Sequence, residues 1–161
     1  MAITTQDSTQ FANGAAEPRV MNPTTDAHGR LRFARFSFAQ SGAGDAGSIA
    51  RLAKLPKGKV RVILPLSRVA FSAMGASRTM DLGWETYQAG DGSGDVAADP
   101  NGLDDGVDVS GAGAAVPGGT VGGDETILFE TLAGVVLTAQ VNDGTIPDAA
   151  TLAGHIAYVM D

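Results

Sequence analysis

The fold is decided by residues 59–87, which read KVRVILPLSRVAFSAMGASRTMDLGWETY. At the start of this stretch Val60, Val62 and Leu64 occupy every second position, which is the period of a strand with one buried face. We expect this strand to run from Lys59 to Leu66, and two further β-prone runs follow it within the same stretch. Short strands at such close spacing predict an antiparallel sandwich or barrel.

Further strands are predicted on both sides of this stretch. Residues 48–55 alternate in the same way and are joined to the central stretch by the tight turn Pro56-Lys57-Gly58. Farther along the chain, 126–132 and 135–141 are β-prone and flank Ala133-Gly134, a pattern that is typical of a hairpin.

The first strand, predicted near residues 31–38, has an irregular pattern. Leu31 and Phe33 share one face, whereas Phe36 and Phe38 share the other. Either both faces of this strand are covered, or a bulge shifts its phase.

The last segment, 149–160, fits a helical face as well as one side of a strand. We predict a strand, because the preceding residues 144–147 are typical of a hairpin rather than of a helix cap. The core then comprises the side chains that we expect these strands to turn inward: Phe33, Val60, Val62, Leu64, Phe71, Trp84, Leu128, Phe129, Val136, Leu137, Ile156 and Tyr158.

Length and composition fit one β domain. The chain has 161 residues, enough for a single core, and no Cys, which excludes disulfides and thiol chemistry. Gly occurs 22 times, about twice its usual share of roughly 7%, which indicates many turns. No signal-peptide pattern opens the sequence, and no apolar run approaches the roughly 20 residues that span a bilayer, so we expect no membrane contact. We predict an all-β, antiparallel, jelly-roll-like sandwich or barrel.

Charge is divided between the two halves of the sequence. All 11 Lys and Arg lie between Arg19 and Arg78, while residues 79–161 carry 14 Asp and Glu and no Lys or Arg. Either two solvated faces simply differ, or the basic half docks on an acidic partner. Nucleic acid does not fit as that partner, since the net charge is −7 and no basic run is interleaved with aromatics. The candidate partner-binding residues are Arg19, Arg30, Arg32 and Arg35.

Two segments are predicted to lie outside the strands. Residues 1–30 form an extended N-terminal arm ahead of the single β domain at 31–161, and the arm is so poor in apolar residues that we expect a partner to order the chain up to about residue 40. Residues 88–125 form a long acidic Gly/Asp-rich loop with 11 Gly and seven Asp. The acids of 99–108 could supply carboxylate oxygens to Ca²⁺, but their spacing differs from that of a helix-loop-helix calcium site. We therefore favour solvated Asx turns for this segment.

No catalytic or cofactor motif is complete. Residues 42–47 spell G-x-G-x-x-G, but Pro56 follows too soon for the long helix of a dinucleotide fold, and no acid follows about 20 residues on. His28 and His155 lie far apart in the sequence, and the motifs of serine hydrolases, P-loop proteins and zinc proteases are missing. We therefore predict no enzymatic activity, no cofactor and no metal.

Five blocks of the sequence resemble a family of small structural proteins of tailed bacteriophages. The blocks are GDAGS at 44–48, LPKGKVRVI at 55–63, LSRVAFSAMGASRTMDLGWETY at 66–87, VAADPNGLDDGVDVS at 96–110 and GGDETILFE at 122–130. The resemblance covers roughly residues 40–161 and implies a virion protein, most simply a head decoration or cement protein. It further implies synthesis in the host cytoplasm, a place on the capsid surface, the major capsid protein as partner, and a homo-oligomer.

Two other classes remain open at this stage. A neck, tail or fibre component would share the β-rich, Gly-rich sequence. A soluble carbohydrate-binding module would need an aromatic platform, for which Trp84, Tyr87 and Tyr158 are the candidates.

Overall fold

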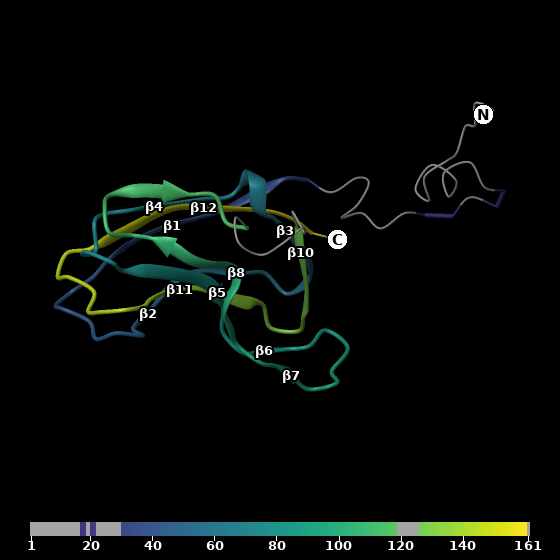
Figure 1. The fold of residues 1–161 in the computed structure, drawn as a ribbon. Helices are drawn as coiled ribbons and strands as arrows, with labels where there is room; N and C mark the ends of the chain where they lie inside the picture. Colours follow the sequence, from purple (N-terminus) through teal and green to yellow (C-terminus); the bar gives the residue numbers. More distant parts are fainter. Residues whose placement is uncertain (1–16, 19, 22–29, 119–125, 161) are drawn as a thin grey trace, which may run out of the picture.

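Strands dominate the residues that the computed structural model describes, which are 17–18, 20–21, 30–118 and 126–160 (Figure 1). The strands are β1 (Arg32–Ala39), β2 (Ile49–Leu55), β3 (Gly58–Ile63), β4 (Arg68–Phe71), β5 (Thr79–Trp84), β6 (Tyr87–Gln88), β7 (Asp95–Val96), β8 (Asp99–Asp108), β9 (Gly113–Ala115), β10 (Thr126–Thr131), β11 (Val135–Val141) and β12 (Thr151–Met160). One helical turn, η1 (Leu64–Leu66), lies among them, and no helix in the described ranges is long and apolar enough to cross a membrane. The all-β prediction is confirmed.

One sheet is built around the last strand, and we name it the β12 sheet. β12 pairs along one edge with β1, from Arg32↔Tyr158 to Ala39↔Thr151, which confirms the choice of strand over helix for this segment. Along its other edge it pairs with β3 and then with β4. β3 and β4 thus act as one interrupted strand, and β10 and β9 pair with them on the outside.

The interruption between β3 and β4 has a local cause. Pro65 has no N–H to donate to a ladder, so the strand expected to reach Leu66 ends at Ile63 and the chain makes the single turn η1. Buried Ser67 closes the gap, because its hydroxyl donates to the Ile63 carbonyl at 2.9 Å and accepts the Ala157 N–H at 3.0 Å.

The second sheet has the order β2-β11-β5-β8 and is antiparallel throughout; we name it the β11 sheet. It lies under the β12 sheet, and the β6–β7 hairpin projects from the body beside it (Figure 1). Along the chain the connections cross repeatedly from one sheet to the other, and the consecutive strands of the sandwich that stay in one sheet are β3 and β4, β5 and β8, and β9 and β10. This is the connectivity of a jelly roll.

The crossings correct the hairpin that was predicted at Ala133-Gly134, whereas the tight turn predicted at 56–58 does join two successive strands. The turn at 56–58 joins β2 in one sheet to β3 in the other, and Ala133-Gly134 likewise joins β10 to β11. Neither turn therefore closes a hairpin. The turns were located correctly, but a turn between neighbouring strands and a turn between facing sheets use the same residue types.

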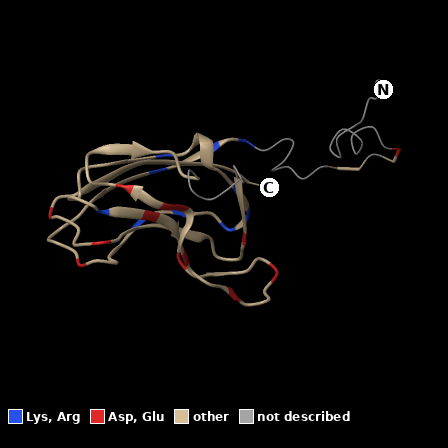
Figure 2. Cartoon of the chain, in the orientation of Figure 1, with Lys and Arg blue, Asp and Glu red and all other residues tan. Residues whose placement is uncertain are grey.

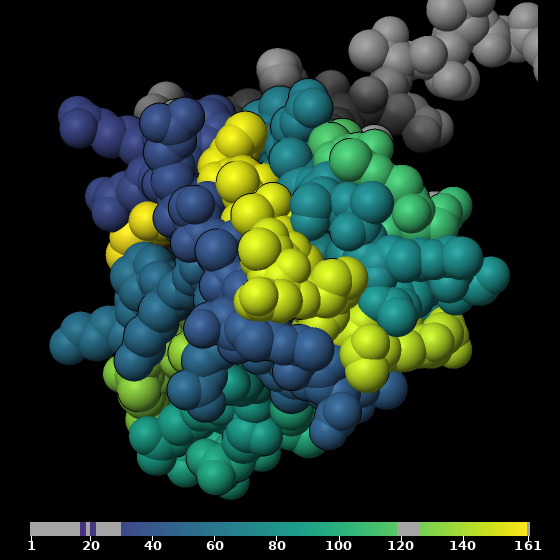
Figure 3. All heavy atoms as spheres, turned by 90° about the vertical axis from the view of Figure 1, so that its left-hand side faces the viewer, coloured from purple at the N-terminus to yellow at the C-terminus, as the bar shows by residue number. Residues whose placement is uncertain are grey.

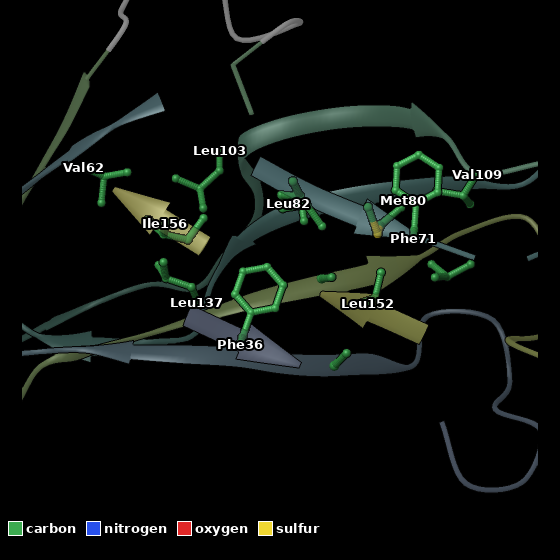
Figure 4. Close-up of a cluster of buried hydrophobic side chains, with 14 of the residues drawn as sticks. Phe36, Val62, Phe71, Met80, Leu82, Leu103, Val109, Leu137, Leu152 and Ile156 are labelled. Carbon is green, nitrogen blue, oxygen red and sulfur yellow. The ribbon is translucent and has the colours of Figure 1, made fainter. Parts of the chain in front are cut away.

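The core fills the space between the two sheets (Figure 4). Phe36, Val62 and Ile156 of the β12 sheet face Leu82 and Leu137 of the β11 sheet there. Seven of the predicted core residues are buried: Val60, Val62, Leu64, Phe71, Phe129, Leu137 and Ile156. Trp84 and Tyr158 are half-buried against this core, and Val136 is half-buried.

Two predicted core residues are exposed instead. Phe33 is 52% exposed and Leu128 is 41% exposed. The register explains both, since Phe33 lies opposite Ala157, and Leu128 opposite Arg61, on the face of the β12 sheet that points away from the β11 sheet. β1 buries Phe36 and pairs without a bulge, so its outward aromatic is left in solvent.

The long loop that was predicted for residues 88–125 contains a strand of the sandwich. β8 is a ten-residue strand of the β11 sheet, and it buries Leu103 and Asp104. Its pairing with β5 shifts register twice, so its side chains do not alternate as those of a regular strand do. Gly102 is required there, because a Cβ at that position would lie 2.2 Å from the Trp84 ring.

The end of the sandwich shown in Figure 3 is closed by two loops that lie side by side. Gly44, in the loop after β1, forms an isolated bridge with Ile146, in the loop before β12, and the Gln40 N–H donates to the Ala150 carbonyl at 2.8 Å. These bonds hold the first and last strands of the domain in register at this end.

Candidate partner-binding surface

The two sheets carry opposite charge (Figure 2). The strands of the β12 sheet hold five Lys or Arg and one Glu, and those of the β11 sheet hold two Lys or Arg and five Asp. The topology therefore turns the difference in charge between the two halves of the sequence into a difference in charge between the two faces of the sandwich. Such a difference favours binding of an anionic surface on the β12 side.

Two acids of the β11 side accept hydrogen bonds in local turns. Asp99 accepts the Asn101 N–H at 3.3 Å, and Asp108 accepts the Ser110 N–H at 2.9 Å. Hydrogen bonds from the Ser110 side chain and backbone lower the pKa of Asp108. In the described ranges no group of three or more His, Cys, Asp or Glu side chains is arranged to hold a metal ion. The Asx-turn interpretation of 99–108 is therefore confirmed for Asp99 and Asp108.

Three basic side chains form a row across the outer face of the β12 sheet. Arg35 on β1 lies opposite His155 on β12, and His155 lies opposite Arg68 on β4. We name these three residues the cationic row. Both arginines are exposed and His155 is half-buried. Within the described ranges neither arginine takes part in an ion pair, whereas Arg51 pairs with Glu85 and Lys59 with Glu130.

Apolar side chains flank the cationic row. Phe33 packs edge-on against His155 with ring centroids 5.2 Å apart, and these two residues with Arg35 line an open hollow of about 370 Å³. Leu31 is 45% exposed and Leu66 is 50% exposed. The surface therefore combines positive charge with exposed apolar area, as a protein interface does.

Only some of the predicted partner-binding residues lie on this face of the β12 sheet. Arg19 lies outside the described residues. Arg30 is exposed just before β1, Arg32 begins β1 and donates from Nη1 to the Met160 sulfur at 3.0 Å, and Arg35 belongs to the cationic row. Because β1 is paired along its whole length with β12, residues 32–39 need no partner to order them, which corrects the expectation for that part of the chain.

The sequence reasoning missed Arg68, His155 and the exposed Phe33 as members of this surface. Only the register brings Arg68 and His155 beside Arg35 from positions 33 and 120 residues farther along the chain. The sequence did contain a signal that Phe33 is exposed. In a strand, Phe33 must point to the face opposite that of Phe36 and Phe38.

The aromatic residues proposed as a sugar platform lie elsewhere. Trp84 and Tyr87 both pack edge-on against buried Phe129, with ring centroids 5.1 and 5.8 Å away, and desolvation raises the pKa of Tyr87. Tyr158 packs against the core. These rings belong to the interior of the sandwich and do not form an exposed stacking plane.

Comparison with known proteins gives matches only at the level of structure. No family model and no curated protein sequence matches the chain. A chain of the capsid of Ralstonia phage GP4 superposes with a TM-score of 0.62 at 21% identity, covering 94% of this chain and 96% of that one. A chain of the cyanophage Pam1 capsid asymmetric unit gives 0.57 at 14% identity, covering 99% and 100%.

A third structure shares the fold over part of its length. The infectious bursal disease virus VP2 chain of a subviral particle superposes with a TM-score of 0.50 at 11% identity, and the match covers 83% of this chain and 33% of that one. At these identities the likeness establishes a common jelly-roll fold.

Proposed function

We propose that this chain is a structural protein of a tailed-phage virion, and specifically a decoration or cement protein bound to the outside of the head. One observation carries the proposal. The two phage capsid chains correspond to this chain over nearly the full length of both partners, so the similarity extends to the whole of each chain and is not limited to one module. The resemblance of the five sequence blocks to phage structural proteins points the same way.

The proposed mechanism is stabilisation by added contacts. A protein that binds only the assembled shell, and bridges neighbouring subunits, stabilises the shell by mass action. The basic and apolar face of the β12 sheet would contact the major capsid protein, and the acidic β11 side would face outward. We further propose that the protein acts as a homo-oligomer, because several weak attachments made together hold far more firmly than one.

The direct test uses heads that lack this protein. We expect such heads to release their DNA at a lower temperature than decorated heads, and added purified protein to restore the difference. Release can be followed with a dye that fluoresces on free DNA during heating. Identical release curves for bare and decorated heads would contradict the cement function.

The number of copies per particle separates the proposed function from its alternative. A decoration protein should be present in hundreds of copies, comparable to the major capsid protein, whereas a neck, tail or fibre component should be present in a few to dozens. Quantitative mass spectrometry of purified virions measures this ratio. A low ratio would favour the neck, tail or fibre function.

The role of the N-terminal arm is tested by truncation. Deleting residues 2–29 should weaken attachment to heads and leave the β domain folded, because β1 and its pairing with β12 begin at Arg32. Circular dichroism checks the fold, and cosedimentation with heads across a salt titration checks attachment. Full decoration by the truncated protein would show that the arm is not an anchor.

A further inference from the structure

We propose that the cationic row (Arg35, His155 and Arg68), with Phe33 beside it, binds an Asp- or Glu-bearing segment on the surface of a protein partner. Given the proposed function, that partner is a capsid subunit, and the inference names the chemistry of the attachment. It differs from the sequence prediction because two of the three residues lie on β12 and β4, far from the arm in sequence.

The spacing of the cationic row fits a pair of carboxylates. Neighbouring strands lie about 4.8 Å apart, so three directly opposed side chains span about 10 Å of the sheet surface. That distance accommodates two carboxylates side by side, and each Arg can hold one through two parallel N–H···O bonds. His155 places Nε2 3.1 Å from the Leu66 carbonyl. Because a carbonyl can only accept, Nε2 carries a hydrogen, and Nδ1 can donate to a carboxylate when the ring is in its doubly protonated form.

The row concentrates positive charge on the sheet face. One arginine lies on each side of His155, so the two arginines are two strand spacings apart, about 10 Å, and their charges repel each other. The carboxylate on a strand of the same sheet, Glu130, is already engaged with Lys59 at 3.0 Å. Among the described residues nothing compensates the row. An anionic partner would supply the missing countercharge.

The apolar surroundings of the row favour protein carboxylates over the phosphates of nucleic acid. Phe33 and Leu66 expose about half of their surface beside the row, and apolar area of this kind is matched by apolar side chains of a protein. A long polyanion would also be repelled by the net charge of −7. A short acidic segment on a folded protein avoids both penalties.

The test measures attachment to heads that lack the protein, at several salt concentrations. Arg35→Ala/Arg68→Ala should weaken binding by at least about tenfold and flatten its salt dependence, because the charge pairs that steer association are removed. His155→Gln and Phe33→Ser should each weaken binding by a smaller factor. The matched control is Lys54→Ala, which removes one exposed positive charge from β2 in the opposite sheet and should change binding by less than about twofold.

A second measurement needs no particle. A short poly-glutamate peptide, added to the ¹⁵N-labelled protein, should shift the NMR signals of the Arg35 and Arg68 side chains and of the His155 ring. It should leave Arg51, on the other sheet, unchanged. A short DNA duplex at the same charge concentration should shift the row less than the peptide does.

The outcomes separate the two proposals. Wild-type protein that fails to bind heads, yet responds to poly-glutamate at the row, would overturn the cement function and support the row as a carboxylate site. Row variants that bind heads as wild type does, at every salt concentration, would overturn the row and leave the cement function standing. Stronger shifts with DNA than with poly-glutamate would overturn the choice of a protein partner.

Discussion

Replacing Gly102 with Ala should destabilise the sandwich by about 1–3 kcal/mol, which is the usual cost of adding a methyl group where there is no room. The added Cβ would lie 2.2 Å from Cη2 and 2.3 Å from Cζ3 of Trp84, and 3.0 Å from the Asp99 carboxyl carbon. The indole is not free to move, because it also packs edge-on against buried Phe129 with ring centroids 5.1 Å apart. The strain must therefore be taken up by β8 or by the ring.

A double-mutant cycle tests whether the contact with Trp84 is the cause. Trp84→Ala alone should cost about 3 kcal/mol, at the low end of the range for Trp, because the ring is half-buried. In Gly102→Ala/Trp84→Ala the methyl group enters space that the ring has vacated. The double variant should then be more stable than the sum of the single costs predicts, by about 1–2 kcal/mol.

The free energies come from urea unfolding followed by far-UV circular dichroism, since two of the four proteins lack the tryptophan that would report by fluorescence. Gly111→Ala is the matched control. A Cβ at Gly111 meets no atom within 4 Å, so its cost should stay within about 0.5 kcal/mol. The steric explanation would be refuted if Gly102→Ala were as stable as the control. It would also be refuted if the losses of the two single variants simply added up in the double variant.

Three further predictions concern the sandwich. Phe36→Ala should cost about 3–5 kcal/mol while Phe33→Ala, on the opposite face of β1, should cost well under 1 kcal/mol; similar losses in thermal unfolding would mean that the faces of β1 are assigned wrongly. Ser67→Ala should lower the free energy of unfolding by about 1–3 kcal/mol, because it leaves the buried N–H of Ala157 without its acceptor. A loss below 0.5 kcal/mol would indicate that Ala157 finds another acceptor. Since Ser110 lowers the pKa of Asp108 in the folded chain, this carboxylate adds stability above its unfolded pKa of about 3.9, and the contribution is lost as pH falls from there through the folded value. An NMR titration should place the Asp108 midpoint lower in the wild type than in Ser110→Ala, and equal midpoints would contradict the assignment.

The sequence was informative where one physical signal dominates. Alternation identified β3 and the buried residues Val60, Val62 and Leu64, because a strand with one buried face must alternate. It failed at β8, where two register shifts against β5 and a glycine that admits Trp84 leave no regular period to detect. It also failed at Phe33. The hydrophobicity of this residue suggested burial, although it lies an odd number of positions before Phe36, so the two side chains point to opposite faces of β1.

The candidate surface was harder to predict than the fold. The charge asymmetry between the halves of the chain was visible, and Arg35 was chosen from it. Arg68 and His155 could not be chosen, because their position beside Arg35 depends on which strands become neighbours in the sheet. Turn residues indicate where strands end, but they do not indicate whether the chain returns to the same sheet or crosses to the other.

The central place of the last strand affects how the protein can be made. The chain leaves the ribosome from its N-terminus, and β1 must wait for β12, about 120 residues later, before it can pair. At ordinary rates of synthesis this delay is roughly 10 s, during which the aromatic side chains of β1 are without their native neighbours. A nascent chain that stops short of its last ten described residues also lacks the strand that joins β1 to β3 and β4. Prematurely terminated products therefore cannot complete this sheet, and only chains translated through to β12 are competent to fold.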